Sequence, residues 1–123
     1  MNIVEQYWKL IDERKWEELA GVFHPDSIIY WPNTNEKFKL NEFILANKRY
    51  PGNWRVTLKH VMVTNNAQVS VAKVINESEG VSFHATSICE IKDGKILSLH
   101  EYWGDDAQPP QWRRALGIGS KIE

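Results

Sequence analysis

Apolar side chains recur every three or four residues near the start of the chain, which is the period of an amphipathic α-helix. The pattern predicts one helix over residues 3–14 and a shorter second helix over residues 16–23. The second helix should end near His24-Pro25, because proline disfavours helical backbone in the residue before it. A short β-branched and aromatic strand is expected over residues 27–31, followed by a third helix over residues 40–50.

Further along the chain the period changes to two, which is the period of a strand with one buried face. The alternation runs over residues 54–62, 69–75, 81–91 and 95–105, with turn residues between the runs. Four such strands in succession predict an antiparallel meander, and helices followed by strands are typical of an α+β domain. We therefore expect a cone-like, curved antiparallel sheet wrapped around the N-terminal helices.

The last two strands are joined by Lys92-Asp93-Gly94, for which we predict a three-residue loop with a bulge at Gly94. The cross-strand pairs that follow are Ile91 with Lys95, Cys89 with Leu97, Ser87 with Leu99, Ala85 with Glu101 and Phe83 with Trp103. This inner face is apolar except at Ser87 and Glu101. A carboxylate on an apolar concave face is the most informative feature of the sequence.

The size and charge of the chain exclude several classes of protein. Its 123 residues suit a single domain, and 15 basic against 16 acidic residues, scattered along the chain, argue against a nucleic-acid partner. No apolar run approaches the roughly 20 residues that span a bilayer, and the N-terminus lacks the pattern of a signal peptide. We therefore expect a cytoplasmic protein with no membrane contact. The single cysteine, Cys89, reads as a buried small hydrophobe.

The C-terminal tail should lie outside the sheet. We assign residues 1–104 to the α+β cone domain and residues 105–123 to a tail, because Pro109-Pro110 cannot extend a sheet. The tail also carries Trp112, and an aromatic tail of this kind is expected to dock on the cone mouth or on a partner subunit.

Several short motifs carry a family resemblance. They are Trp16-Glu17-Glu18-Leu19, Phe23-His24-Pro25-Asp26-Ser27, Lys92-Asp93-Gly94-Lys95-Ile96 and Glu101-Tyr102-Trp103. With the order of elements, they make the span from Ile3 to about Trp103 resemble the nuclear transport factor 2-like superfamily, and more closely its SnoaL-like branch. The tail is similar to that of a set of largely uncharacterised bacterial members. The resemblance implies the cone fold and leaves the chemistry open, because the superfamily includes isomerases, cyclases, dehydratases, epoxide hydrolases and non-catalytic binding modules.

Ketosteroid isomerase, one enzyme of that superfamily, is similar at two positions. Its helix-one tyrosine, an oxyanion hydrogen-bond donor, falls on Tyr7, and a tryptophan of its last strand falls on Trp103. Its general-base aspartate falls on Trp31 and its second acid falls near Ser87, so both acids are missing here. The comparison implies that any base must come from elsewhere, and Glu101 is the carboxylate that the predicted register places inside.

Two functions fit these residues. Burial would raise the pKa of Glu101 toward the range useful for proton transfer, with Tyr7 as a hydrogen-bond donor. The protein would then be a cofactor-independent isomerase, cyclase or hydrolase acting on an apolar carbonyl-type or epoxide-type small molecule. The alternative is a non-catalytic ligand-binding or dimerisation module in which Glu101 forms a structural ion pair with Arg55 or Arg113.

Six tryptophans suggest an aromatic pocket as well as a core. Trp8 and Trp16 are expected in the core. The predicted ligand-binding residues are Trp31, Asn47, Trp54, Phe83, Ser87, Leu99 and Trp103.

The outer face of the closing hairpin carries large side chains. They are His84, Thr86, Ile88, His100 and Tyr102. Two histidines are too few for a zinc site, so we expect no metal and no cofactor. A sheet face with such side chains usually covers something, so we predict a homodimer through this outer face.

Overall fold

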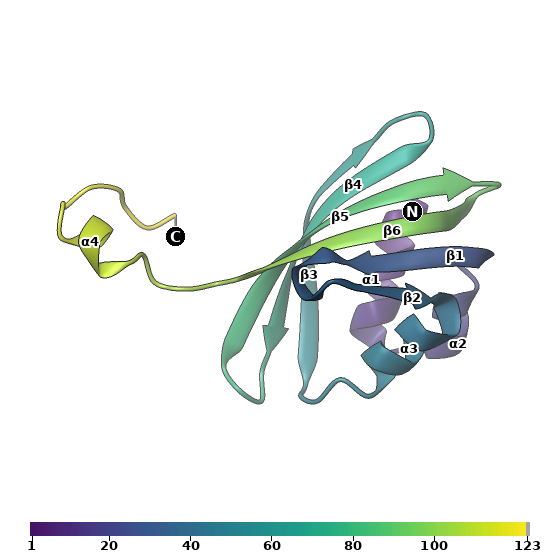
Figure 1. Ribbon diagram of the computed structural model, residues 1–123, viewed down its shortest axis with the longest axis horizontal. Coiled ribbons are helices and arrows are strands. Elements are labelled where there is room, and N and C mark those ends of the chain that lie inside the picture. The colour runs from purple at the N-terminus through teal and green to yellow at the C-terminus, as the bar shows by residue number, and fades with distance from the viewer. Residues whose placement is uncertain (123) are drawn as a thin grey trace.

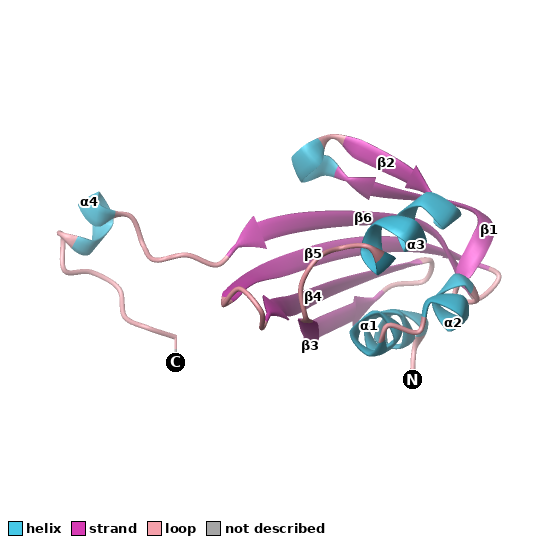
Figure 2. Cartoon of the chain, turned by 90° about the horizontal axis from the view of Figure 1, so that it is seen from below, coloured by secondary structure: helices cyan, strands magenta, loops and turns pink. Residues whose placement is uncertain are grey.

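The computed structural model describes residues 1–122 and shows a strongly curved six-stranded sheet with three helices on its concave side (Figure 1, Figure 2). The elements are α1 (Ile3–Glu13), α2 (Trp16–Ala20), β1 (Phe23–Trp31), the 3₁₀ helix η1 (Pro32–Thr34), β2 (Glu36–Lys39), α3 (Leu40–Lys48), β3 (Trp54–Val63), β4 (Ala67–Asn76), β5 (Val81–Lys92), β6 (Lys95–Asp105) and α4 (Gln111–Arg114). The strand order is β2-β1-β6-β5-β4-β3, and the sheet does not close on itself. Neighbouring strands are antiparallel except β1 and β6, which run parallel. The predicted α+β fold is therefore confirmed.

The first helix begins at a capping box that its sequence encodes. The Asn2 side chain accepts a hydrogen bond from the Glu5 amide at 2.8 Å, and the Glu5 side chain accepts one from the Asn2 amide at 3.1 Å. Arg14 ends the helix in the left-handed conformation. Between these ends, α1 buries Tyr7 and Trp8 on the face that meets the sheet, as the spacing predicts.

Some element boundaries differ from the prediction. α2 ends at Ala20, and β1 begins at Phe23 and runs through Pro25. Pro25 is tolerated because the pairing of β1 with β6 is irregular between Phe23 and Ile28, so no ladder hydrogen bond from residue 25 is needed. The short strand β2 and the helix α4 were not predicted, because four residues are too few for a periodic pattern to show.

The closing hairpin turns in a different way from the one predicted. Asp93 and Gly94 both have positive φ, which makes a two-residue turn, and Lys92 pairs with Lys95. An extra residue, Leu97, then shifts the register, because Ile91 pairs with Ile96 whereas Glu90 pairs with Ser98. The predicted pairs were therefore wrong: Glu101 lies opposite Ser87, and Trp103 lies opposite Ala85. The predicted inner face is nevertheless right, because the error is two residues and side chains alternate with that period.

The core fills the narrow part of the cone with aromatic rings. Tyr7, Phe23 and Phe43 are buried, and their ring centroids lie 5.8 Å to 6.4 Å apart in edge and stacked arrangements. Ile29 on β1 and Leu99 on β6 pack beneath them as parallel neighbours. Within residues 1–122, no helix is long and apolar enough to cross a bilayer.

The tail leaves the domain. After β6 the chain runs outward, and α4 stands away from the sheet and from the three other helices (Figure 1). Residues 104–122 are all exposed. In this structure the tail lies away from its own cone, and docking on the cone mouth or on a partner subunit stays a prediction.

We expect Gly52→Ala to destabilise the fold more than Gly80→Ala. Both glycines have positive φ, at 108° and 69°, so alanine costs roughly 1–2 kcal/mol of backbone strain at either position. At Gly52 a Cβ would also lie 2.4 Å from Nδ2 of the buried Asn76, whereas at Gly80 it meets nothing within 4 Å. The overlap should cost about 1–3 kcal/mol more in the free energy of unfolding measured by urea denaturation. Equal losses in the two variants would contradict the predicted overlap.

Candidate functional site

A cavity of about 790 Å³ lies between the concave face of the sheet and helices α1 and α3. This volume lies in the range of small-molecule sites. Its lining residues are Tyr7, Trp8, Ile11, Arg14, Trp16, Trp31, Asn33, Thr34, Glu36, Asn47, Lys48, Tyr50, Trp54, Val56, Val74, Phe83, Glu101, Trp103 and Asp105. The wall is mostly apolar and aromatic, with a few polar groups that could orient a ligand.

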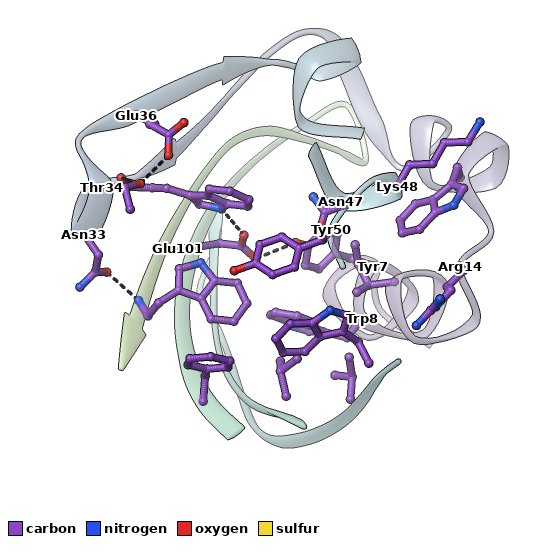
Figure 3. Close-up of a pocket in the computed structure, with 18 of the residues that line it drawn as sticks. Tyr7, Trp8, Arg14, Asn33, Thr34, Glu36, Asn47, Lys48, Tyr50 and Glu101 are labelled. Carbon is purple, nitrogen blue, oxygen red and sulfur yellow. Dashed lines mark hydrogen bonds between the residues drawn. The ribbon is translucent and has the colours of Figure 1, made fainter. Parts of the chain in front are cut away.

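Glu101 is the buried acid of this cavity. Its side chain comes from β6, is 1% exposed, and accepts hydrogen bonds from two elements (Figure 3). The Tyr7 hydroxyl donates to Oε2 at 2.6 Å, and the Trp31 indole Nε1 donates to Oε1 at 2.8 Å. Ser87, opposite Glu101 on β5, is also buried, but its Oγ forms no hydrogen bond of normal geometry with a described residue.

The pKa of Glu101 is raised from its ordinary value. The main cause is burial, which removes water from the charged carboxylate. The hydrogen bonds from Tyr7 and Trp31 favour the charged form and oppose this effect, but they do not overcome it. Glu101 therefore holds its proton more strongly than an exposed glutamate, which is the property a proton-transfer group needs near neutral pH.

No ion pair within residues 1–122 involves this carboxylate. Among residues 1–122 the ion pairs are Lys15 with Glu13, Arg55 with Asp12 and His84 with Asp106. Arg55 lies at 3.2 Å from Asp12 on α1, and Arg113 lies on the outlying tail. The ion pairs that sequence alone allowed for Glu101 are therefore absent from the described part of the chain.

One hydrogen bond joins the Tyr7 hydroxyl to the Glu101 carboxylate. Burial, and then the nearby negative charge of Glu101, raise the pKa of Tyr7 well above its ordinary range, so the hydroxyl stays protonated. When Glu101 is ionised, that hydroxyl hydrogen points at Oε2 and is not available to a ligand. When Glu101 is protonated, its own hydrogen can bond the Tyr7 oxygen, and Tyr7 can then donate into the cavity.

Four aromatic side chains predicted as ligand-binding residues do line the cavity. The Trp31 and Trp103 rings meet edge to face with centroids 6.4 Å apart, and Phe83 meets Trp103 at the same distance. Trp54 continues this wall from β3, 5.6 Å from Phe83. Asn47 also lines the cavity, although its amide nitrogen donates to the Phe43 carbonyl of its own helix at 2.9 Å.

Two predicted residues, Ser87 and Leu99, do not line the cavity. Leu99 is fully buried between Cys89 and Ile29, and Ser87 lies behind Glu101 on the next strand. The physical reason is the register of the closing hairpin, which sets both residues deeper in the core than the predicted pairing does.

Sequence reasoning missed the rim of the cavity and part of its wall. Trp8 and Trp16 belong to the core as expected, Trp8 as a buried member and Trp16 packed against it, and both also line the cavity. Trp8 donates from Nε1 to the buried Ser70 hydroxyl at 3.0 Å. The missed rim residues are Arg14, Asn33, Thr34, Glu36, Lys48, Tyr50 and Asp105, which are polar or aromatic residues near the ends of elements. Of these residues, Asn33 had the clearest signal in the sequence, because an asparagine in a turn after Pro32 can form a hydrogen bond with a neighbouring strand. In the structure its Oδ1 accepts a hydrogen bond from the Trp103 amide at 2.7 Å.

The Cys89 thiol is buried and poorly suited to nucleophile chemistry. Burial, and then the charge of Glu101, raise the pKa of its thiol to about 12. A thiol of this kind stays protonated and unreactive at neutral pH. The described residues also contain no group of three His, Cys, Asp or Glu side chains that could hold a metal ion.

The fold and the cavity define the class of protein. A cone-shaped α+β domain with an inward-facing cavity is the architecture of the nuclear transport factor 2-like superfamily, and residues 4–99 match the family model described as a SnoaL-like domain. The chain belongs to this SnoaL-like family. No curated protein matches the sequence.

Solved structures share the fold at low sequence identity. A Kribbella flavida protein assigned as a ketosteroid isomerase has a TM-score of 0.84 at 20% identity, over 98% of this chain and 89% of its own. A Mycobacterium tuberculosis epoxide hydrolase similar to LEH has a TM-score of 0.71 at 14% identity, over 83% and 80%. A Sinorhizobium meliloti protein assigned as a polyketide cyclase has a TM-score of 0.67 at 21% identity, over 80% and 92%. At these identities the matches show a common fold.

We expect Tyr7→Phe to raise the pKa of Glu101 further. The change removes a donor that stabilises the carboxylate and keeps the aromatic ring that packs on Trp8 and Phe23. The measurement is the pH dependence of the Glu101 side-chain carboxyl ¹³C shift in NMR, with Glu101→Gln to assign the signal. Tyr30→Phe, whose ring stacks on His100 outside the cavity, is the matched control and should leave that pKa unchanged. A lowered pKa in Tyr7→Phe would contradict the hydrogen-bond assignment.

Burial of Glu101 should also make stability depend on pH. Its folded-state pKa is raised, so the folded protein binds this proton more tightly than the unfolded chain, and the proton's contribution is complete below the ordinary carboxyl pKa of 4.5. The contribution is lost as pH rises from there through the raised pKa. The free energy of unfolding of the wild type minus that of Glu101→Gln should therefore fall across this window in urea titrations. A rise in the same window would show a stabilised carboxylate instead.

Proposed function

We propose that the cavity binds an apolar small molecule with a carbonyl-type or epoxide-type group, and that Glu101 exchanges a proton with it as general acid or base. One observation carries the proposal: Glu101 is a buried carboxylate on the cavity wall, beside Tyr7, with no cationic partner among the described residues. A structural carboxylate would normally be neutralised or solvated, because an uncompensated buried charge is costly.

The shared contact of Glu101 and Tyr7 allows a balanced proton transfer at a carbonyl compound. Ionised Glu101 takes the proton from the carbon next to the carbonyl, and the electron pair of the broken C–H bond moves into the enolate. Protonated Glu101 then donates its hydrogen bond to the Tyr7 oxygen, which frees the Tyr7 hydroxyl to donate to the enolate oxygen. Glu101 then returns the proton to carbon. Return to a different carbon completes an isomerisation, and return to the original carbon regenerates the substrate.

The aromatic walls support the choice of substrate class. Rings from Trp31, Trp54, Phe83 and Trp103 present apolar faces, so most of the ligand surface should be hydrocarbon. The similar folds of proteins assigned as a ketosteroid isomerase and a polyketide cyclase, and of an epoxide hydrolase, are consistent with carbonyl or epoxide chemistry in such a cone. They do not choose between these reactions.

A second function, ligand binding without catalysis, has one observation in its favour. Both oxygens of Glu101 already accept hydrogen bonds from the protein, from Tyr7 and from Trp31. A carboxylate with this role would tie α1 and β1 to the sheet and would leave the cavity as a passive binding site. It would keep its function after conversion to a neutral amide, which an acid or base would not.

We expect Glu101→Gln to slow proton exchange strongly while ligand binding persists. The assay is deuterium uptake at the carbon next to the carbonyl of an apolar cyclic ketone in D₂O, followed by NMR, with hydrolysis of an apolar cyclic epoxide measured in parallel. Loss of a general base should lower the rate by about 10²–10⁴-fold. Binding of the same ketone, followed by tryptophan fluorescence, should change much less.

Glu79→Gln, an exposed carboxylate in the turn between β4 and β5, is the matched control and should react like the wild type. In the opposite outcome, the wild type and Glu101→Gln both bind the ketone and the epoxide and leave them equally unreacted. That outcome would overturn the catalytic proposal in favour of the binding module.

A further inference from the structure

The tail has the composition of an interaction arm. The arm, residues 107–123, includes three basic side chains, Arg113, Arg114 and Lys121, and one acidic side chain, Glu123. Trp112 is 65% exposed, and Leu116 and Ile118 are exposed to a similar degree. These three large apolar side chains lie within seven residues of one another, and all of them are exposed to solvent. A cluster of exposed apolar side chains indicates a surface that is buried in an assembly.

The residue before the arm, Asp106, is fixed to the convex side of the sheet. The Asp106 amide donates to the Ser82 carbonyl at 3.1 Å, and the Ser82 hydroxyl donates to Asp106 Oδ2 at 2.6 Å. The other carboxylate oxygen bonds the exposed His84 ring. Three contacts to β5 therefore set the direction in which the arm leaves the domain.

The next residues keep the arm away from its own cavity. Pro109 and Pro110 follow within four residues, and Pro110 has φ −63° and ψ 152°, the extended polyproline conformation. A spacer of this kind is stiff and advances about 3.1 Å per residue. Trp112 is thus carried outward from the sheet, as Figure 1 shows for α4 as a whole.

The convex face of the sheet also has large apolar side chains that are exposed. Ile88 on β5 is 41% exposed and Tyr102 on β6 is 45% exposed, and the two lie on neighbouring strands. Tyr30 on β1 stacks on His100 with ring centroids 4.2 Å apart and extends this apolar surface. None of these four residues lines the cavity on the other side of the sheet.

We propose that two copies of the chain exchange arms, each laying Trp112, Leu116 and Ile118 on the convex face of the other around Ile88 and Tyr102. The partner is inferred to be a second copy because the surfaces are complementary within one chain. Residues 1–106 carry 12 basic and 15 acidic side chains, so a basic arm is attracted to a body of the opposite net charge.

The order of charges along the arm fits a two-fold axis. An acidic pair, Asp105-Asp106, precedes the stiff spacer, and a basic pair, Arg113-Arg114, follows it. When two such arms cross in antiparallel directions, as two-fold symmetry requires, the basic pair of each lies near the acidic root of the other. Asp105, Arg113 and Arg114 are exposed and form no ion pair within residues 1–122, so they are available for this contact.

The direct test places a spin label on one arm and observes a different chain. A Cys89→Ser, Ser120→Cys chain at natural isotope abundance is labelled at residue 120 and mixed with a ¹⁵N-labelled Cys89→Ser chain that carries no label. We expect amide signals on the convex face of the ¹⁵N chain, around Ile88 and Tyr102, to broaden and to recover after the label is reduced. No broadening across chains, or broadening confined to the cavity rim, would overturn the proposal.

A charge exchange supplies an independent test. Asp105→Arg alone, and Arg113→Asp with Arg114→Asp, should each weaken self-association about tenfold in sedimentation, because every dimer contains two such contacts. An equimolar mixture of the two variants should recover the association as a heterodimer, detected by native mass spectrometry. Lys9→Asp, an exposed charge on α1, is the matched control and should associate like the wild type.

A mixture that does not recover, or a chain truncated after Asp106 that associates as well as the full chain, would show that the arm does not hold the dimer. Neither test depends on the proposed chemistry of Glu101, so the two proposals can fail separately.

Discussion

Burial of the Glu101 carboxylate is the constraint on which the site depends. A charged oxygen removed from water requires donors, and the chain supplies one from α1, Tyr7, and one from the end of β1, Trp31. These bonds connect the first helix, the first long strand and the last strand at one point of the cavity wall. Because desolvation still outweighs the donors, the carboxyl group retains a raised pKa, and proton affinity becomes a property of the fold rather than of the residue.

Trp31 occupies a position at which this chain differs from ketosteroid isomerase, an enzyme of the same superfamily. In ketosteroid isomerase the corresponding position holds the general base, whereas here an indole occupies it and donates to an acid on another strand. The buried carboxylate of this site, Glu101, lies on the last strand, and its hydrogen-bond donor Tyr7 lies on α1.

The two faces of the sheet differ in what their side chains meet. Aromatic side chains gather on the concave face and leave a cavity of about 790 Å³, because large rings at the wide end of a cone cannot fill it as they fill the narrow end. On the convex face, Ile88 and Tyr102 remain exposed beside the root of the tail. The concave face therefore borders a cavity, whereas the convex face leaves large apolar side chains exposed.

Local patterns determined much of this protein. The spacing of apolar residues was sufficient to place α1 and the four long strands, and the alternation along β6 was sufficient to put Glu101 inside, because both follow from periods of a few residues. The tertiary structure decided what those residues meet. Tyr7 and Glu101 are 94 positions apart, and their contact depends on a bulge at Leu97 and on sheet curvature. Neither Leu97 nor the rim residues have a periodic signature, because a bulge or a rim position is defined by the neighbouring elements rather than by the residue itself.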